Sequence, residues 1–447
     1  MTSQSRLQAL WDKLQSSYWF VPSVMTSLAV ALAFILLAAD RRIDGDSSWL
    51  GWAYGGGADG ARALLSAVAS STITVVSVTF SVTVVALTVS SQHFGPRLLN
   101  NFMRDKAAQT VLGTFIATFA FCLIVLRTVK GDGDTYGPFV PHLSVTAAVA
   151  LTLLTVAALI YYVHHVSASM QVARITLMVA RDLEASIDRL YPADVGDTTE
   201  VPVQAPPLPP EAAEVGSHSS GYIQAIDLDF ALALANKHQV CIWLCARPGD
   251  FVAEGARLAA VYPLPAGDSE FAAKLRRAYV IGADRSPYQD AAFAIQQLVE
   301  VALHALSPGI NEPFTAITCI DRLGQGLIKL ACRQLPAAVR ADDNGYPRLV
   351  AEPQSFSDLL DAAFAPITVY AGSNPAIYQR LLETLETVAG RARQSADRAA
   401  IVQQAEHVRQ AAFQAVRGGP FPRLEDLYHR ILTATRQSSV ESTHGRS

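Results

Sequence analysis

Charged residues are scarce in this chain of 447 residues, and they are unevenly distributed. Asp, Glu, Lys and Arg make up 17% of the sequence, against about 25% in an ordinary soluble protein. Four stretches contain no formal charge, at residues 14–39, 63–96, 107–126 and 135–171. Each is long enough to cross a hydrocarbon core of about 30 Å as a helix. Charges return at ordinary density after Arg174, so we expect membrane-spanning helices followed by a large soluble part.

The sequence also lacks the marks of several functional classes. It contains no phosphate-binding loop, dinucleotide fingerprint, nucleophile elbow or zinc motif, so we predict no enzymatic activity, no cofactor and no metal site. A net charge of −4 argues against a nucleic-acid partner, because such proteins usually carry a basic face. The five cysteines show no disulfide-like framework, and we interpret them as small buried thiols in a reducing compartment.

The apolar stretches predict four transmembrane helices, at about residues 18–39, 65–90, 107–127 and 140–163. The first is longer than the 7–15 residues of a signal-peptide core, so we interpret it as an uncleaved anchor. Orientation follows from the Lys and Arg residues that flank the spans. With the N-terminus inside, the inner flanks hold Arg6, Lys13, Arg97, Arg104, Lys106, Arg174 and Arg181, and the outer loops hold Arg41, Arg42, Arg62, Arg127 and Lys130. This bias favours a multi-pass protein with its N-terminus and its large domain in the cytoplasm.

The second span differs from the others in its density of Ser, Thr and Val. One hydroxyl stripe recurs along it at steps of three and four, interrupted at Val84, and consists of Ser70, Thr74, Ser77, Ser81 and Thr88. A neighbouring stripe consists of Thr72, Thr79, Thr83 and Ser90. Small hydroxyl residues let membrane helices approach closely, so helix packing is one interpretation. The other is that the first stripe faces water as the wall of a pore in a homo-oligomer.

The remaining chain predicts an α+β domain in several parts. We expect a helical stalk and Pro-rich linker at 173–215, a small β-rich unit at 216–268, a helical domain at 269–436 and a disordered tail at 437–447. Within the β-rich unit, the turn at 247–255 resembles that of biotinyl/lipoyl-like domains, where glycines permit a tight reversal. The modifiable Lys of such domains is missing here, so we expect a scaffold without the cofactor.

A polar corner is predicted where two helices meet, at about 291–306 and 313–329. Arg285 and Asp290 precede the first helix, and Asn311 and Glu312 lie between the two, where Asn311 is placed to cap the second. One hypothesis is a nucleotide- or ion-sensing pocket formed by these four residues. The alternative is that they serve as helix caps and ion pairs in a folded hairpin.

Four stretches together resemble the bacterial predicted membrane protein family labelled domain of unknown function 2254. They lie at 79–97, 221–227 (GYIQAID), 247–252 (RPGDFV) and 305–316 (ALSPGINEPFTA). Asp is more usual in that family at the position of Glu312. The resemblance implies a bacterial inner-membrane protein of similar architecture, and it supplies no catalytic residues.

Two functions are compatible with these observations. The first is an oligomeric channel or passive permeation protein in the lipid bilayer, lined by the second span and regulated by the cytoplasmic domain. The alternative is a membrane-anchored sensor or scaffold whose soluble domain binds a ligand or a protein partner.

Overall fold

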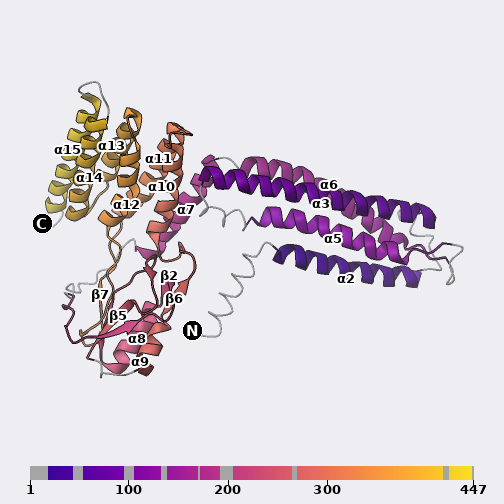
Figure 1. The fold of residues 1–447 in the computed structure, drawn as a ribbon, viewed down its shortest axis with the longest axis horizontal. Helices are drawn as coiled ribbons and strands as arrows, with labels where there is room; N and C mark the ends of the chain where they lie inside the picture. Colours follow the sequence, from indigo (N-terminus) through magenta and orange to yellow (C-terminus); the bar gives the residue numbers. More distant parts are fainter. Residues whose placement is uncertain are drawn as a thin grey trace. The chain divides into compact units, whose positions relative to one another are not determined.

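The chain is divided into two compact units, residues 1–171 and 172–447 (Figure 1). The computed structural model describes residues 19–43, 54–94, 105–131, 138–169, 172–191, 205–263, 269–415 and 422–444.

The N-terminal unit contains four long apolar helices, as the charge-free stretches predicted. They are α2 (Phe20–Ile43), α3 (Ala58–Phe94), α5 (Lys106–Thr128) and α6 (His142–Ser169). All four are long and apolar enough to cross a membrane. The second is longer than expected, because α3 begins at Ala58 rather than near residue 65.

Helix α5 is the centre of this unit, because it packs against α2, α3 and α6. It is mostly buried, whereas only about a fifth of the residues in the apolar part of each of the other three helices is buried. Phe115, Phe121 and Val125 of α5 are fully inaccessible. One end of the unit is tied by Asp40 of α2, whose carboxylate accepts hydrogen bonds from the amides of Leu143 (2.9 Å) and Ser144 (3.0 Å) in the first turn of α6. That contact caps α6 from another helix.

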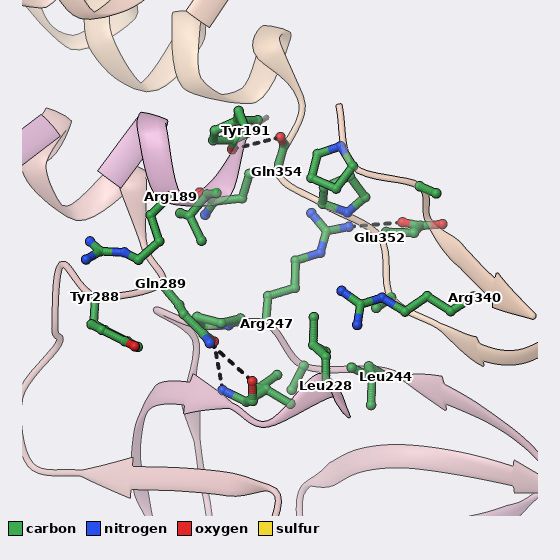
Figure 2. A pocket seen from close by; sticks show the side chains of 18 residues that line it. Arg189, Tyr191, Leu228, Leu244, Arg247, Tyr288, Gln289, Arg340, Glu352 and Gln354 are labelled. Carbon is green, nitrogen blue, oxygen red and sulfur yellow. Dashed lines mark hydrogen bonds and ion pairs between the residues drawn. The ribbon is translucent and has the colours of Figure 1, made fainter. Parts of the chain in front are cut away.

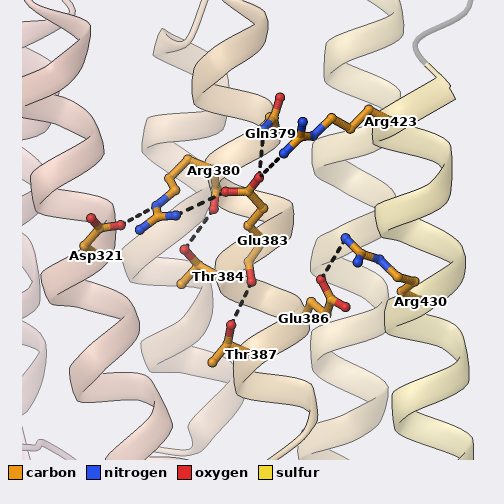
Figure 3. A network of polar contacts seen from close by, with 9 residues as sticks. All are labelled: Asp321, Gln379, Arg380, Glu383, Thr384, Glu386, Thr387, Arg423 and Arg430. Carbon is orange, nitrogen blue, oxygen red and sulfur yellow. Dashed lines mark hydrogen bonds and ion pairs between the residues drawn. The ribbon is translucent and has the colours of Figure 1, made fainter.

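Six helices of the C-terminal unit, α10 to α15, form three stacked hairpins, and α7 (Val172–Leu190) packs beside the first hairpin. The hairpins consist of α10 (Ala291–Ala305) with α11 (Pro313–Ala331), α12 (Phe356–Tyr370) with α13 (Pro375–Ala389), and α14 (Ser395–Ala415) with α15 (Pro422–His444). Helices α10, α12 and α14 pack in one row, and α11, α13 and α15 pack in a second (Figure 1). Polar ties join the second row, as Figure 3 shows for Arg380 of α13, which contacts Asp321 of α11 and Glu383 of its own helix.

The strands of the same unit form two sheets. The larger has the order β1-β5-β3-β8-β7 and the smaller the order β4-β2-β6. Their bounds are β1 (Ala213–Gly216), β2 (Gly221–Ile226), β3 (Cys241–Leu244), β4 (Phe251–Val252), β5 (Arg257–Tyr262), β6 (Tyr279–Gly282), β7 (Val339–Ala341) and β8 (Pro347–Val350). Helices α8 (Leu228–His238) and α9 (Ser269–Arg276) accompany them, with α8 and Phe271 and Leu275 of α9 contributing to the apolar core.

This arrangement differs from the expected domain plan in three ways. Strands β7 and β8 join the sheets from outside residues 216–268, and β8 pairs parallel with β3, so a biotinyl/lipoyl-like unit is not confirmed. Helix α7 packs along α10 and α11 instead of standing alone as a stalk. Helix α15 continues to His444, into the expected disordered tail. Residues 192–204, part of the expected stalk and Pro-rich linker at 173–215, lie outside the described residues.

Candidate functional site

A cavity of about 360 Å³ lies in the C-terminal unit where several separate segments meet (Figure 2). One wall comes from Arg189, Leu190 and Tyr191 at the end of α7. An adjoining wall comes from the connection between β8 and α12, residues 351–354. The β-rich part supplies the floor. Because these segments are far apart in sequence, the cavity exists only in the folded unit.

Hydrogen bonds fix the segments around the cavity. The buried Tyr191 donates its hydroxyl to the backbone carbonyl of Gln354 (3.1 Å). The side-chain amide of Gln289 accepts from the backbone N–H of Ile226 (2.8 Å) and donates to the carbonyl of the same residue (3.2 Å). Ser186 of α7 donates to the carbonyl of Pro287 (2.9 Å). The walls are therefore positioned before any ligand arrives.

The cavity lining carries more positive than negative charge. Three arginines line it, Arg189, Arg247 and Arg340, against the single carboxylate of Glu352. Nη2 of Arg247 lies 3.0 Å from the Glu352 carboxylate. The Arg340 guanidinium lies 3.2 Å from Asp229, whose side chain is almost fully exposed. Such a lining favours an anionic ligand.

Apolar and aromatic groups supply the rest of the lining. Ile226, Leu228, Leu244 and Ala246 contribute apolar surface. At another edge the Arg189 guanidinium lies over the ring of Tyr288, 4.7 Å from its centroid, which is a cation–π contact. An apolar surface with a few charged groups is the usual composition of a small-molecule site.

The structure brings together two residues of the predicted corner, Arg285 and Asp290. Their closest atoms are 2.6 Å apart, and Asp290 is fully inaccessible. Asp290 also caps α10 by accepting from the backbone N–H of Phe293 (3.1 Å). Burial raises the pKa of Asp290, while the neighbouring Arg285 guanidinium and hydrogen bonds from Phe293 and Gln354 act to lower it. The pair is thus a structural cap and ion pair behind the cavity.

The other two residues of that corner, Asn311 and Glu312, lie elsewhere. They follow α10, and Asp290 precedes it, so 15 helical residues separate the pairs, a rise of about 22 Å. Both are exposed. The expected cap is also corrected, because Glu312 rather than Asn311 occupies the N-cap of α11 and makes no side-chain capping bond. The distance along α10 disfavours the hypothesis of one pocket formed by all four residues, and Arg285 and Asp290 fit the alternative of a cap and an ion pair.

The two hydroxyl stripes of α3 face different surroundings. Ser70, Thr74, Ser77, Ser81 and Thr88 are all exposed on the isolated chain. Several bond only to their own helix, as when Ser81 donates to the carbonyl of Ser77 (2.9 Å). The second stripe packs inside the unit: Thr83 lies 2.6 Å from the Tyr162 hydroxyl, and Thr72 and Thr79 are buried. Intrachain helix packing therefore uses the second stripe. The Ser90 side chain lies outside the described residues.

The cysteines differ in their exposure. Cys122 and Cys319 are buried, as predicted, whereas Cys241 and Cys332 are half-buried and Cys245 is exposed, which corrects the expectation for those three. Burial raises the pKa of Cys319 to about 12 and that of Cys241 to about 11, so neither forms a thiolate readily at neutral pH. Among the described residues there is no group of three His, Cys, Asp or Glu able to hold a metal ion.

The three cavity arginines could not be predicted from the sequence as parts of one site. The turn at 247–255 has a recognisable pattern because of its glycines, and that pattern indicates no role for Arg247. Arg189, Arg340 and Glu352 belong to no motif, and only the fold brings them to one place.

Comparison with known proteins confirms the resemblance noted in the sequence. The family model described as Predicted membrane protein (DUF2254) matches residues 15–387. The chain is similar to the uncharacterised protein Rv1290c of Mycobacterium tuberculosis (strain ATCC 25618 / H37Rv) and to the uncharacterised protein Mb1321c of Mycobacterium bovis. Each is 34% identical over 394 residues, covering 86% of this chain and 74% of the relative. No solved structure is detectably similar.

Proposed function

This chain belongs to the predicted membrane protein family DUF2254, and we propose from that premise that it is a membrane-anchored receptor for a small anionic ligand. The ligand binds in the cavity of the C-terminal unit. One observation carries the proposal: residues 189–191, at the end of α7, form part of the cavity wall. Only two residues separate the start of α7 from the end of α6, the last apolar helix.

Helix α7 is suited to transmit occupancy of the cavity. Asp188, near its end, binds Lys329 of α11 (2.6 Å) and Arg333, which lies just after α11. Tyr191 is held by Gln354. A ligand that moves the 351–354 connection therefore acts on the end of α7 through the contact between Tyr191 and Gln354. A ligand shifts the equilibrium between two conformations only if it binds one of them more tightly than the other. The residues of α7 and of the 351–354 connection that line the cavity could make contacts that differ between two such conformations.

We propose that the protein lies in the bacterial inner membrane with its N-terminus and C-terminal unit in the cytoplasm. The Lys and Arg bias of the span flanks supports this orientation. Protease added to sealed inside-out vesicles is expected to cleave the C-terminal unit, and protease added to intact spheroplasts is expected to leave it whole. The reverse pattern contradicts the orientation.

Ligand binding can be tested on the full-length protein in nanodiscs of neutral lipid. The probes are AMP and citrate, and the variants are Arg247→Ala and the control Arg257→Ala. Arg257 also pairs with one glutamate, Glu214 at 2.8 Å, and is similarly exposed, but it lies outside the cavity. We expect the wild type and Arg257→Ala to bind at least one probe and Arg247→Ala to bind it at least about tenfold more weakly. Failure of the wild type to bind either anion contradicts the proposal.

A second candidate function is permeation through a homo-oligomer, and the exposure of the first hydroxyl stripe favours it. In an oligomer that face either packs against another chain or lines a path for water. If it lines a path, Ser77→Cys and Ser81→Cys react with aqueous thiol reagents in intact membranes faster than Val82→Cys, an exposed site that lies about 100° or more around the helix from both. Protection of Ser77→Cys and Ser81→Cys, or equal reactivity of all three variants, contradicts permeation along this stripe.

A further inference from the structure

We propose that the ligand of this cavity is a phosphate monoester attached to a flat ring system, such as a mononucleotide, and that its phosphate replaces the Glu352 carboxylate on Arg247. The inference rests on the proposed function, because it names the ligand class for the same cavity. The Glu352 carboxylate then competes with the phosphate for Arg247 and lowers the affinity of the cavity for the ligand.

Arg247 is placed to receive a phosphate. Its backbone N–H donates to Asp250 (2.8 Å), which fixes the base of the side chain. Figure 2 shows the side chain extending across the cavity towards Glu352. That pair is one contact between two partly exposed groups, with side chains 41% and 69% accessible. Exposed ion pairs are weak, whereas a phosphate offers more charge and several acceptor oxygens to the planar guanidinium fork.

Arg340 supplies a second cation. It reaches into the cavity from β7, as Figure 2 shows. Its partner Asp229 is 97% exposed and lies outside the lining, so a phosphate in the cavity competes with a contact that water already weakens. A dianionic phosphate balances the excess positive charge of the lining better than a single carboxylate does.

The remaining lining favours a ring over a purely charged ligand. Ile226, Leu228 and Leu244 offer apolar surface to one part of the ligand, and the more exposed Tyr288 offers an aromatic edge. A cavity of about 360 Å³ falls in the usual range for small-molecule sites. Citrate carries enough charge for the arginines but has no apolar body to cover this surface.

Substitution of Glu352 provides the sharpest test. Removing its charge is expected to change the affinity for the ligand without changing the fold. Glu352→Gln keeps the size of the side chain and removes the competing carboxylate. Glu214→Gln is the matched control, since Glu214 pairs with Arg257 at 2.8 Å with similar exposure, away from the cavity. Release of a weak exposed ion pair corresponds to a gain in affinity of up to about fivefold.

The experiment is calorimetric titration of the full-length protein in neutral-lipid nanodiscs with AMP, adenosine and citrate, and with phosphatidic acid vesicles as the lipid source of the same phosphate. We expect AMP to bind at least about tenfold more tightly than adenosine or citrate. Glu352→Gln is expected to bind AMP about three- to fivefold more tightly, Glu214→Gln to match the wild type, and Arg340→Ala to bind AMP several-fold more weakly. AMP binding is also expected to weaken as salt is raised.

Citrate binding as tightly as AMP, or an unchanged AMP affinity in Glu352→Gln, overturns the phosphate-ester inference but leaves the anion receptor standing. Binding of the vesicles without binding of AMP overturns it in favour of a lipid headgroup. Absence of binding by every anion overturns both proposals. Melting curves of each variant show whether a loss of affinity comes from a loss of fold.

Discussion

The hydroxyl of Tyr191 donates a hydrogen bond to the backbone carbonyl of Gln354 at 3.1 Å, joining residues 163 positions apart in the sequence. Tyr191 is the residue that follows α7, and Gln354 lies in the connection from β8 to α12. The ring is 2% exposed. This contact links two walls of the cavity, and burial raises the pKa of the Tyr191 hydroxyl, so it remains a protonated donor at neutral pH.

Tyr191→Phe removes that hydrogen bond and keeps the ring. Because the half-buried carbonyl of Gln354 loses its partner, we expect a loss of about 1 kcal/mol in the free energy of unfolding of the C-terminal unit. Thermal unfolding of the full-length protein followed by circular dichroism measures it. Tyr370→Phe is the control, since Tyr370 is 57% exposed. An equal effect of the two substitutions contradicts the role given to Tyr191.

Gly249→Ala is expected to destabilise the unit by at least about 2 kcal/mol. Gly249 has a φ of +96°, and a Cβ built there lies 2.3 Å from Oδ2 of Asp290. Two controls separate strain from collision in unfolding experiments. Gly255→Ala meets open space at a φ of +83° and is expected to cost about 1 kcal/mol. Gly309→Ala meets open space without a positive φ and is expected to change little. Equal melting temperatures for all three variants contradict the close contact of Gly249 with Asp290.

Asp397 makes stability depend on pH. Its side chain is largely buried, at 6% exposure, and burial raises the pKa of the carboxyl from 3.8 to about 6 against the opposing charge of Arg398. A carboxyl with a raised folded-state pKa contributes its full stability below the unfolded-state pKa, and the contribution is lost as pH rises through about 6. Asp397→Asn is therefore expected to match the wild type near pH 4.

At pH 7.5 we expect Asp397→Asn to be the more stable protein, by up to about 3 kcal/mol. Chemical unfolding of the full-length protein at several pH values measures the difference. Asp343→Asn changes an exposed aspartate and is expected to have no effect at either pH. A wild type that is more stable than Asp397→Asn at pH 7.5 contradicts the buried, unfavourable charge.

In the N-terminal unit, Tyr162→Phe is expected to weaken helix packing, whereas Ser77→Ala is not. The Tyr162 hydroxyl donates to the carbonyl of Thr79 (3.0 Å) and lies 2.6 Å from Thr83, so it joins α6 to α3. The Ser77 hydroxyl donates to the carbonyl of Ile73 in its own helix. Interhelical bonds in membranes contribute roughly 0.6–1 kcal/mol. Unfolding in mixed micelles measures both variants. An equal loss of stability contradicts the division between the two stripes.

The helices could be predicted from the sequence, but their arrangement could not. Charge-free stretches located the four apolar helices because a membrane helix must be apolar along its whole length. The central position of α5 could not be predicted from the sequence. A helix face that contacts lipid and a face that packs against another helix are both apolar, so the sequence does not distinguish them. Spacing of three and four located α10 and α11, but not the stacking of the three hairpins.

The cavity depends on pairings that span long sequence distances. Strand β8 lies beside β3 through Ile242 and Leu349, and this pairing brings Glu352 close to Arg247. A single sequence carries no local signal for a parallel pairing of that separation, because each strand reads as a short apolar run. Arg285 and Asp290 could be predicted to lie together because they are close in the sequence. In the structure they form an ion pair, and Asp290 caps α10.

Hydrogen–deuterium exchange of the full-length protein in nanodiscs, with and without AMP, tests most directly whether ligand binding in the cavity acts on α7. We expect slower exchange of backbone amides at 186–191, which comprise the end of α7 and Tyr191 after it, and at 351–355 when AMP binds, and no such change in Arg247→Ala. Binding of AMP that leaves exchange at 186–191 unchanged contradicts the claim that the cavity acts on α7.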